Sequence, residues 1–175
     1  MRSILAVAAV LALAGGTAHA DDFAIIGGIS STALHSPDNT GELQTIAKGG
    51  GATVTMLCDC DDATFGWELN TLFLLGDDQA RVYDLGLSGI ASFNVKGKHA
   101  VPFITFGLDM SAVSLPVQGS DDKERGVSLG LHGGGGLHGF LGDKVYWRGT
   151  VGFLGAGANG LTTQLMVGWV FGSDR

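Results

Sequence analysis

Five neighbouring residues, Cys58 to Asp62, are the group in this sequence best suited to chemistry, because two thiols and three carboxylates are all metal ligands. Their spacing matches neither a full zinc motif nor a calcium loop, which needs a glycine and a distal glutamate. In an exported chain a cysteine pair more often forms a disulfide. A bond between Cys58 and Cys60 requires a turn, since residues two apart in a strand lie at the limit of the allowed Cα separation. Free or intermolecular thiols are the alternative, and no metal or cofactor is predicted.

The sequence HGGGG at 132–136 is similar to the oxyanion-hole glycines of lipases. Lipase chemistry also needs a serine at a strand-to-helix turn, and the chain after its first 20 residues shows almost no helical pattern. The dipeptide His35-Ser36 is the other, weak, indication of a Ser–His–acid set. We interpret the glycines as structural, because glycine lets a strand bend or lets a neighbouring backbone approach closely.

Most of the chain alternates apolar and polar residues with a period of two, in segments of roughly ten residues separated by turn residues. The clearest segments are 145–153 and 161–171, where one face carries Val145, Trp147, Val151, Phe153, Leu161, Leu165, Val167, Trp169 and Phe171. The other face carries Tyr146, Arg148, Thr150, Gly152, Thr162, Gln164, Met166 and Gly168. The glycine-rich stretch 126–138 follows the same rule and is therefore predicted to be a strand.

Eight segments of this kind are present, at about 23–34, 45–58, 65–75, 82–95, 102–112, 126–138, 145–153 and 161–171. The connectors between them are roughly 35–44, 59–63, 76–80, 96–100, 114–125, 141–143 and 155–160. These lengths favour antiparallel neighbours joined by hairpins, because parallel strands need crossovers of about a dozen residues or more. The sequence therefore predicts an all-β fold of eight antiparallel strands.

The polar face distinguishes a soluble barrel, which hides its apolar face inside, from a transmembrane barrel, which turns that face to lipid. It is mostly Gly, Ser, Thr and Asn, and its few charged residues are Glu68, Asp84, Asp109 and Arg148. Small residues suit the narrow interior of an eight-stranded barrel. On the apolar face, Trp67, Trp147 and Trp169 suit the aromatic belts of a bilayer barrel. We therefore predict an eight-stranded antiparallel up-and-down transmembrane β-barrel.

The N-terminal segment predicts export. Arg2 precedes an apolar run, Ile4 to Ala14, that is too short to span a bilayer, and the sequence AHA at 18–20 fits the rule for signal cleavage. We expect cleavage after Ala20, which leaves a single barrel domain, 21–175. The net charge of −7 becomes about −8 when Arg2 is removed. An acidic exported chain is not expected to bind nucleic acid, because phosphate contacts need clustered Lys and Arg.

With these features the chain resembles the small eight-stranded outer-membrane β-barrels, similar to the OmpA transmembrane domain. The resemblance is greatest over about 82–171, in GIASFNVKGKHAVPFITFGLDM, GLHGGGGLHGFLGDKVYWRGTVGF and LTTQLMVGWVFG. The family usually ends on its terminal aromatic residue, whereas Gly172 to Arg175 follow Phe171 here. The resemblance implies an outer-membrane location with both termini in the periplasm. It also implies outer-membrane lipid and the barrel-assembly machinery as partners.

Four residues of the polar face are predicted to form a network in the lumen: Glu68, Asp84, His132 and Arg148. A lipid-facing arginine near the bilayer midplane costs about 2–4 kcal/mol, and buried charges must be paired. We expect Glu68 to pair with Arg148, with Asp84 and His132 close enough to join. Such a pair either plugs the barrel or gates a narrow water path.

The sequence thus predicts a non-enzymatic outer-membrane barrel with a structural or surface-interaction role and a largely plugged interior that is at most a narrow pore. Two alternatives stay open. One is a lipid-active enzyme on the same barrel, and the other is a soluble exported barrel that binds ligands as lipocalins do.

We predict that Cys58 and Cys60 form an intrachain disulfide in the exported protein, because the compartment is oxidising. Intact-mass measurement after alkylation, with and without prior reduction, tests the bond. Two alkylated thiols in the unreduced protein would contradict it, and a dimer that separates on reduction would show an intermolecular bond instead.

Overall fold

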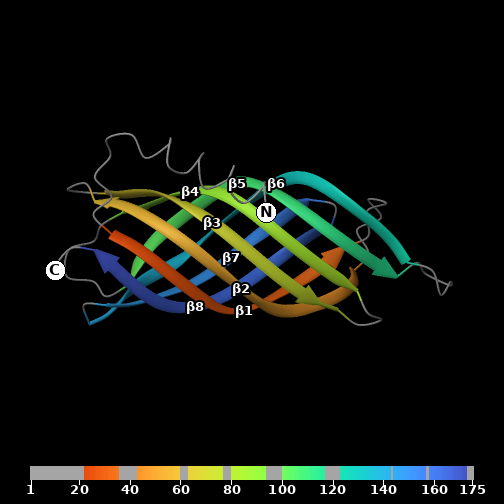
Figure 1. Ribbon diagram of the computed structural model, residues 1–175, viewed down its shortest axis with the longest axis horizontal. Helices are drawn as coiled ribbons and strands as arrows, with labels where there is room; N and C mark the ends of the chain where they lie inside the picture. The colour runs from red at the N-terminus through yellow and green to blue at the C-terminus, as the bar shows by residue number, and fades with distance from the viewer. Residues whose placement is uncertain are drawn as a thin grey trace, which may run out of the picture.

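The structure is a computed structural model that describes residues 22–35, 43–59, 63–76, 80–93, 100–116, 123–142, 144–156 and 158–172. These residues form eight strands: β1 (Asp22–His35), β2 (Leu43–Asp59), β3 (Ala63–Leu75), β4 (Arg81–Phe93), β5 (Val101–Pro116), β6 (Lys123–Leu141), β7 (Val145–Ala156) and β8 (Ala158–Gly172). Figure 1 shows them wound around one long axis with a common tilt. The predicted leader, 1–20, lies outside the described residues. Among the described residues no helix is long and apolar enough to cross a membrane.

The eight strands close into one barrel in which each strand pairs with its neighbours in sequence, and β8 pairs with β1. All pairings are antiparallel, which confirms the predicted up-and-down topology. A path through paired residues that leaves β1 at Ala24 returns to β1 at Leu34, ten residues further along the strand. A stagger of this size over eight strands corresponds to a strand tilt of about 40°, which is typical of membrane barrels.

The barrel has two rims. Asp22 pairs with Gly172 at one of them, the terminal rim, where the chain also passes from β2 to β3, from β4 to β5 and from β6 to β7. The other four connections lie at the opposite, distal rim. The strands are 12 to 19 residues long, so the prediction of about ten residues was too short. The hairpins continue past the alternating segments: β5 and β6 remain paired as far as Pro116 and Lys123, inside the connector predicted at 114–125.

The apolar face of the strands points outward. Its exposed side chains include Ile29, Trp67, Leu108, Leu129 and Phe153. The inward face buries mainly threonine and serine, together with Glu68, Asp109, His138 and Arg148. A soluble barrel has the opposite arrangement, so this distribution favours a lipid environment over the lipocalin-like alternative.

Apolar side chains also fill the lumen near its two rims. Towards the distal rim the buried cluster is Ala47, Leu72, Leu74, Ala80, Val82 and Leu154. Leu72 and Leu74 interrupt the polar alternation of β3, and the structure explains them as part of this cluster. Towards the terminal rim a second cluster contains Ala24, Ile26, Tyr146, Met166 and Val170. Polar side chains are therefore concentrated between two apolar layers.

Glycine dominates the inward positions at half height. When the stagger is followed around the barrel, the eight inward residues at this level are Gly28, Gly51, Asn70, Gly86, Gly107, Gly134, Gly152 and Gln164. A Cβ atom on Gly28 would overlap the carbonyl oxygen of Leu165 on β8 and lie 2.7 Å from the Cα atom of Met166. We call this level the glycine waist, because the backbones approach there and the lumen has few side chains to fill it.

We predict that Gly28→Ala destabilises the barrel by about 1–3 kcal/mol, because its new methyl group would meet backbone atoms that cannot turn away. The matched control is Gly149→Ala, since a Cβ atom on Gly149 would have nothing within 4 Å. The control should change the free energy of unfolding by at most about 0.5 kcal/mol. Urea unfolding in lipid vesicles measures both variants, and equal losses would contradict this account of the waist.

Candidate functional site

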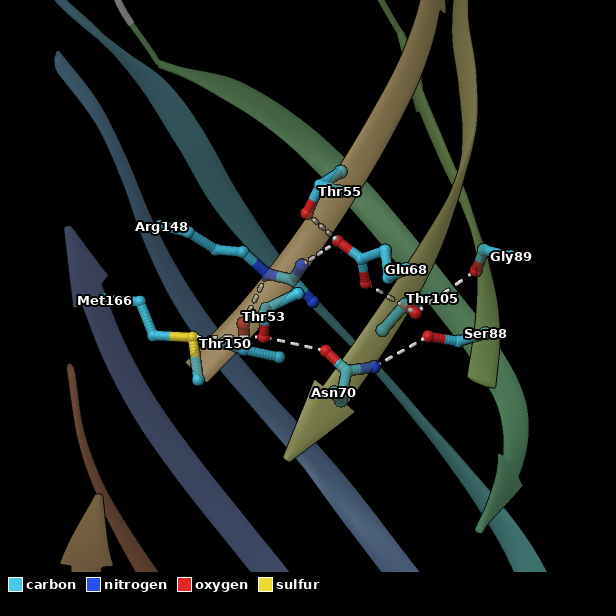
Figure 2. Close-up of polar contacts among 10 residues, drawn as sticks. All are labelled: Thr53, Thr55, Glu68, Asn70, Ser88, Gly89, Thr105, Arg148, Thr150 and Met166. Atoms are coloured by element: carbon cyan, nitrogen blue, oxygen red, sulfur yellow. Dashed lines mark hydrogen bonds and ion pairs between the residues drawn. The ribbon is translucent and has the colours of Figure 1, made fainter. Parts of the chain in front are cut away.

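The ion pair between Glu68 and Arg148 crosses the lumen. Glu68 lies on β3 and Arg148 on β7, and β3 and β7 stand on opposite sides of the eight-stranded barrel. The two residues are only 1% and 3% exposed. Arg148 Nη1 donates a hydrogen bond to Glu68 Oε1, as Figure 2 shows. The pair therefore joins opposite walls of the barrel, on the terminal-rim side of the glycine waist.

Threonines of β2, β5 and β7 complete the hydrogen bonds of this pair (Figure 2). The Thr55 hydroxyl donates to Glu68 Oε1 over 3.2 Å, and Arg148 Nε donates to the Thr150 hydroxyl over 3.0 Å. The Thr105 hydroxyl lies 3.4 Å from Glu68 Oε2 and 3.1 Å from the carbonyl oxygen of Gly89, so it serves two acceptors. Both carboxylate oxygens thus have partners, which a buried ion pair needs to offset its desolvation.

An aromatic floor lies between the ion pair and the terminal rim. Arg148 Cζ is 4.4 Å from the centre of the Phe103 ring, within the range of a cation–π contact. Phe103 meets the His138 ring edge-on at 5.6 Å, and the ring of Tyr146 lies 5.4 Å from that of His138. Phe140 packs against Tyr146 with ring centres 5.3 Å apart. These four rings, from β5, β6 and β7, fill the terminal end of the lumen.

A row of uncharged side chains lies on the other side of the ion pair, towards the waist (Figure 2). The Thr53 hydroxyl donates to Asn70 Oδ1 over 2.8 Å, and Asn70 Nδ2 donates to the Ser88 hydroxyl over 2.9 Å. The row links β2, β3 and β4, whose inward residues at this level would otherwise leave polar groups buried without partners.

The structure places Asp84 and His132 in a second cluster. The Ser111 hydroxyl donates to Asp84 Oδ1, and His132 Nδ1 lies against Asp109 Oδ1. The contacts that these two residues make are therefore to Ser111 and Asp109 rather than to Glu68 and Arg148. Asp109 was not among the four predicted network residues, although it alternates with Ile104 and Met110 on the polar side of its strand. Its pairing with His132 depends on the stagger between β5 and β6, which the sequence pattern does not give.

A cavity of about 50 Å³ lies between the Glu68–Arg148 pair and the cluster that contains Asp84, Asp109 and His132. Its lining includes Asn70, Asp84, Asp109, His132, Arg148 and Gln164. Gly134 and Gly152 of the waist also line it. The open volume therefore coincides with the level at which inward side chains are smallest.

The three tryptophans predicted for the membrane interface lie on the outer surface. Trp67 and Trp169 are 60% and 49% exposed, and Trp147 is partly exposed. All three lie within four residues of the strand end at the terminal rim. Cys58 lies near the same rim, and Cys60 lies outside the described residues, so the disulfide stays a prediction.

The structure offers no lipase site in the glycine-rich strand. The sequence GVSLG at 126–130 has the G-x-S-x-G spacing of a nucleophile elbow, but β6 holds Ser128 in an extended strand rather than at a strand-to-helix turn. Among the described residues no group of three or more His, Cys, Asp or Glu side chains is arranged to hold a metal ion. The described site can close a lumen and hold charge, and it contains no activated nucleophile.

We predict that Glu68→Gln and Arg148→Met each lower the free energy of unfolding by about 3–5 kcal/mol, because each leaves a buried charge unpaired. The double variant should lose less than the sum, since contacting residues couple. Urea unfolding in lipid vesicles gives the coupling energy.

The control cycle combines Arg148→Met with Thr32→Val, which removes a hydroxyl bonded to Thr162 on the β1–β8 side of the barrel. These two changes share no partner and should add. Additive losses for Glu68 and Arg148 would show that the two residues are not coupled.

Comparison with known proteins places this geometry among membrane barrels. No protein-family model matches the sequence, and no curated protein is significantly similar to it. Ail, the attachment invasion locus protein of Yersinia pestis, has a similar structure with a TM-score of 0.63 and 10% identity, over 86% of this chain and 99% of Ail. The N-terminal β-barrel domain of Pseudomonas aeruginosa OprF gives 0.59 at 15% identity, over 86% and 98%. Neisserial surface protein A gives 0.56 at 16% identity, over 86% and 97%. These proteins are small outer-membrane barrels, and the chain has their fold: a closed eight-stranded antiparallel outer-membrane-type β-barrel.

Proposed function

We propose that this protein is an outer-membrane barrel with a structural or surface-interaction role, and that its interior is closed at rest by the Glu68–Arg148 pair. The observation that carries the proposal is the position of this pair, which joins opposite walls of the barrel. The aromatic floor contacts this pair on its terminal-rim side and occupies the terminal end of the lumen. A solute would have to displace both layers to cross the barrel.

The membrane setting is supported by the outward apolar face and by the outer-membrane barrels that the structure resembles. The exposed aromatic residues near both rims, such as Trp67 at the terminal rim and Tyr83 at the distal rim, fit the two interfaces of a bilayer. In this setting the hairpins of the distal rim are the parts available to a surface partner. With both termini in the periplasm, as the resemblance implies, that rim faces the outside.

The charge of the chain bears on the class of surface partner. Ail has been solved in complex with sucrose octasulfate, a heparin analogue. The present chain has a net charge of −7 and only ten Lys and Arg residues. Because polyanions are attracted by clustered positive charge, a sulfated polysaccharide is a poor match to this chain. A neutral or basic partner fits its charge better.

A narrow gated pore is the second candidate, and the cavity favours it. The cavity reaches Arg148 from the waist side, so the pair and the aromatic floor are the layers that separate it from the terminal rim. Opening of the pair and of the aromatic floor would extend the cavity to the terminal rim.

Planar-bilayer conductance tests the proposal. We expect no steady conductance from the wild-type protein, because the ion pair and the aromatic floor close the lumen. Conductance steps in Glu68→Gln or Arg148→Met, absent from the Gly149→Ala control, would show that the pair is a gate. Silence from the wild type and all variants would show a plug and no pore. A large, stable conductance in the wild-type protein would contradict the closed interior.

A further inference from the structure

The second charged cluster is not part of the plug and calls for an explanation of its own. Asp84, Asp109 and His132 come from three adjacent strands, β4, β5 and β6. Asp109 pairs across the sheet with Gly86, and Asp84 lies two residues from Gly86 on the same face. The two carboxylates are therefore diagonal cross-strand neighbours, close enough for long side chains to interact.

Gly86 of the waist gives this cluster its space. A Cβ atom at Gly86 would overlap Asp109 Oδ1 and lie 3.0 Å from His132 Cε1. The absence of a side chain there allows the carboxylate and the imidazole to lie over the β4 backbone. The arrangement is therefore built by the fold at a buried position.

The charges of the cluster do not balance. Asp109 is only 2% exposed, and no described residue donates a hydrogen bond to its Oδ2 atom. The other charged residue that lines the cavity is Arg148, whose guanidinium already pairs with Glu68. Two carboxylates therefore lie beside this cavity, and among the described residues neither has an ion pair with a Lys or Arg side chain. Buried charge of one sign needs a counter-charge or a proton.

The cavity beside the cluster has the size and lining for a small hydrated cation. Its volume of about 50 Å³ exceeds the 10–15 Å³ or so that one water needs, so it holds a few water-sized particles. Asn70, Thr105 and Gln164 line it and add amide and hydroxyl oxygens to the carboxylates. Among the described residues no three His, Cys, Asp or Glu side chains are arranged to hold a metal ion, which disfavours calcium, an ion that takes six to eight oxygen ligands.

We propose that the lumen binds a monovalent cation, of the size of potassium, between Asp84 and Asp109. This site lies on the distal-rim side of the Glu68–Arg148 pair. The cation supplies the missing positive charge, and Asp109 Oδ2 is its principal protein ligand.

Thallium(I), a potassium analogue with strong anomalous scattering, tests the site in crystals of the wild-type protein grown in detergent at pH 8. We expect one anomalous peak inside the cavity, within coordination distance of Asp109 Oδ2. Asp109→Asn should reduce it to background, and Asp84→Asn should reduce it to less than half its height.

The matched control is Ser92→Ala, which removes a buried inward hydroxyl near the terminal rim. It should leave the peak unchanged. A wild-type cavity without a peak, or peaks on the rims alone, would overturn the proposal. A peak that persists in Asp109→Asn would overturn it too. The wild-type crystal decides the matter even if a variant fails to fold, and the result is independent of whether the barrel conducts.

Discussion

The stagger of the strands is the constraint on which the rest of this structure depends. Closing eight strands with an offset of ten residues fixes their tilt and leaves an interior only wide enough for side chains. Each inward residue therefore meets residues from the opposite wall as well as its strand neighbours. Glu68 and Arg148 can form an ion pair because this diameter is within the reach of a glutamate and an arginine.

The narrow interior also explains how the glycines and the charges are related. At the glycine waist backbones approach closely, and a side chain at Gly28 has no room. Apart from Asn70 and Gln164, the longer inward side chains lie on the two sides of the waist, towards the terminal rim and towards the distal rim. The lumen is thus layered along its axis: the aromatic floor, the ion pair, the waist with its cavity, the Asp84–Asp109–His132 cluster and the distal apolar cluster.

Burial has different meanings on the two faces of this barrel. Hydrocarbon can satisfy the outward leucines and phenylalanines, whereas each inward polar group must find its partner inside the protein. The hydroxyls of Thr55, Thr105 and Thr150 meet this need around the ion pair. This requirement accounts for the large share of threonine and serine among the buried residues, which in a soluble core would be mostly aliphatic.

The sequence was sufficient for the strand number, the topology and the assignment of faces, because a period of two is visible within each segment. It placed Glu68 and Arg148 on the inward face for the same reason. It could not give the partners of Asp84 and His132, since these depend on the offset between strands, and nothing local to Asp109 reveals that it meets His132. Leu72 and Leu74 looked like exceptions because a local pattern cannot show that the lumen ends in an apolar cluster. The strand ends were also missed, because hairpins extend beyond the alternating residues.

The position of the three tryptophans has a consequence for how the chain enters a membrane. Trp67, Trp147 and Trp169 all lie near the terminal rim, whereas the aromatic pair at the distal rim is Phe73 and Tyr83. If the chain inserts from the side on which its termini stay, the distal hairpins must cross the bilayer and the tryptophans need not. The indole rings, which prefer the headgroup region, can then settle at the near interface while the hairpins are still moving. The largest interfacial side chains would hold the unfinished barrel at one leaflet without adding to the work of translocation.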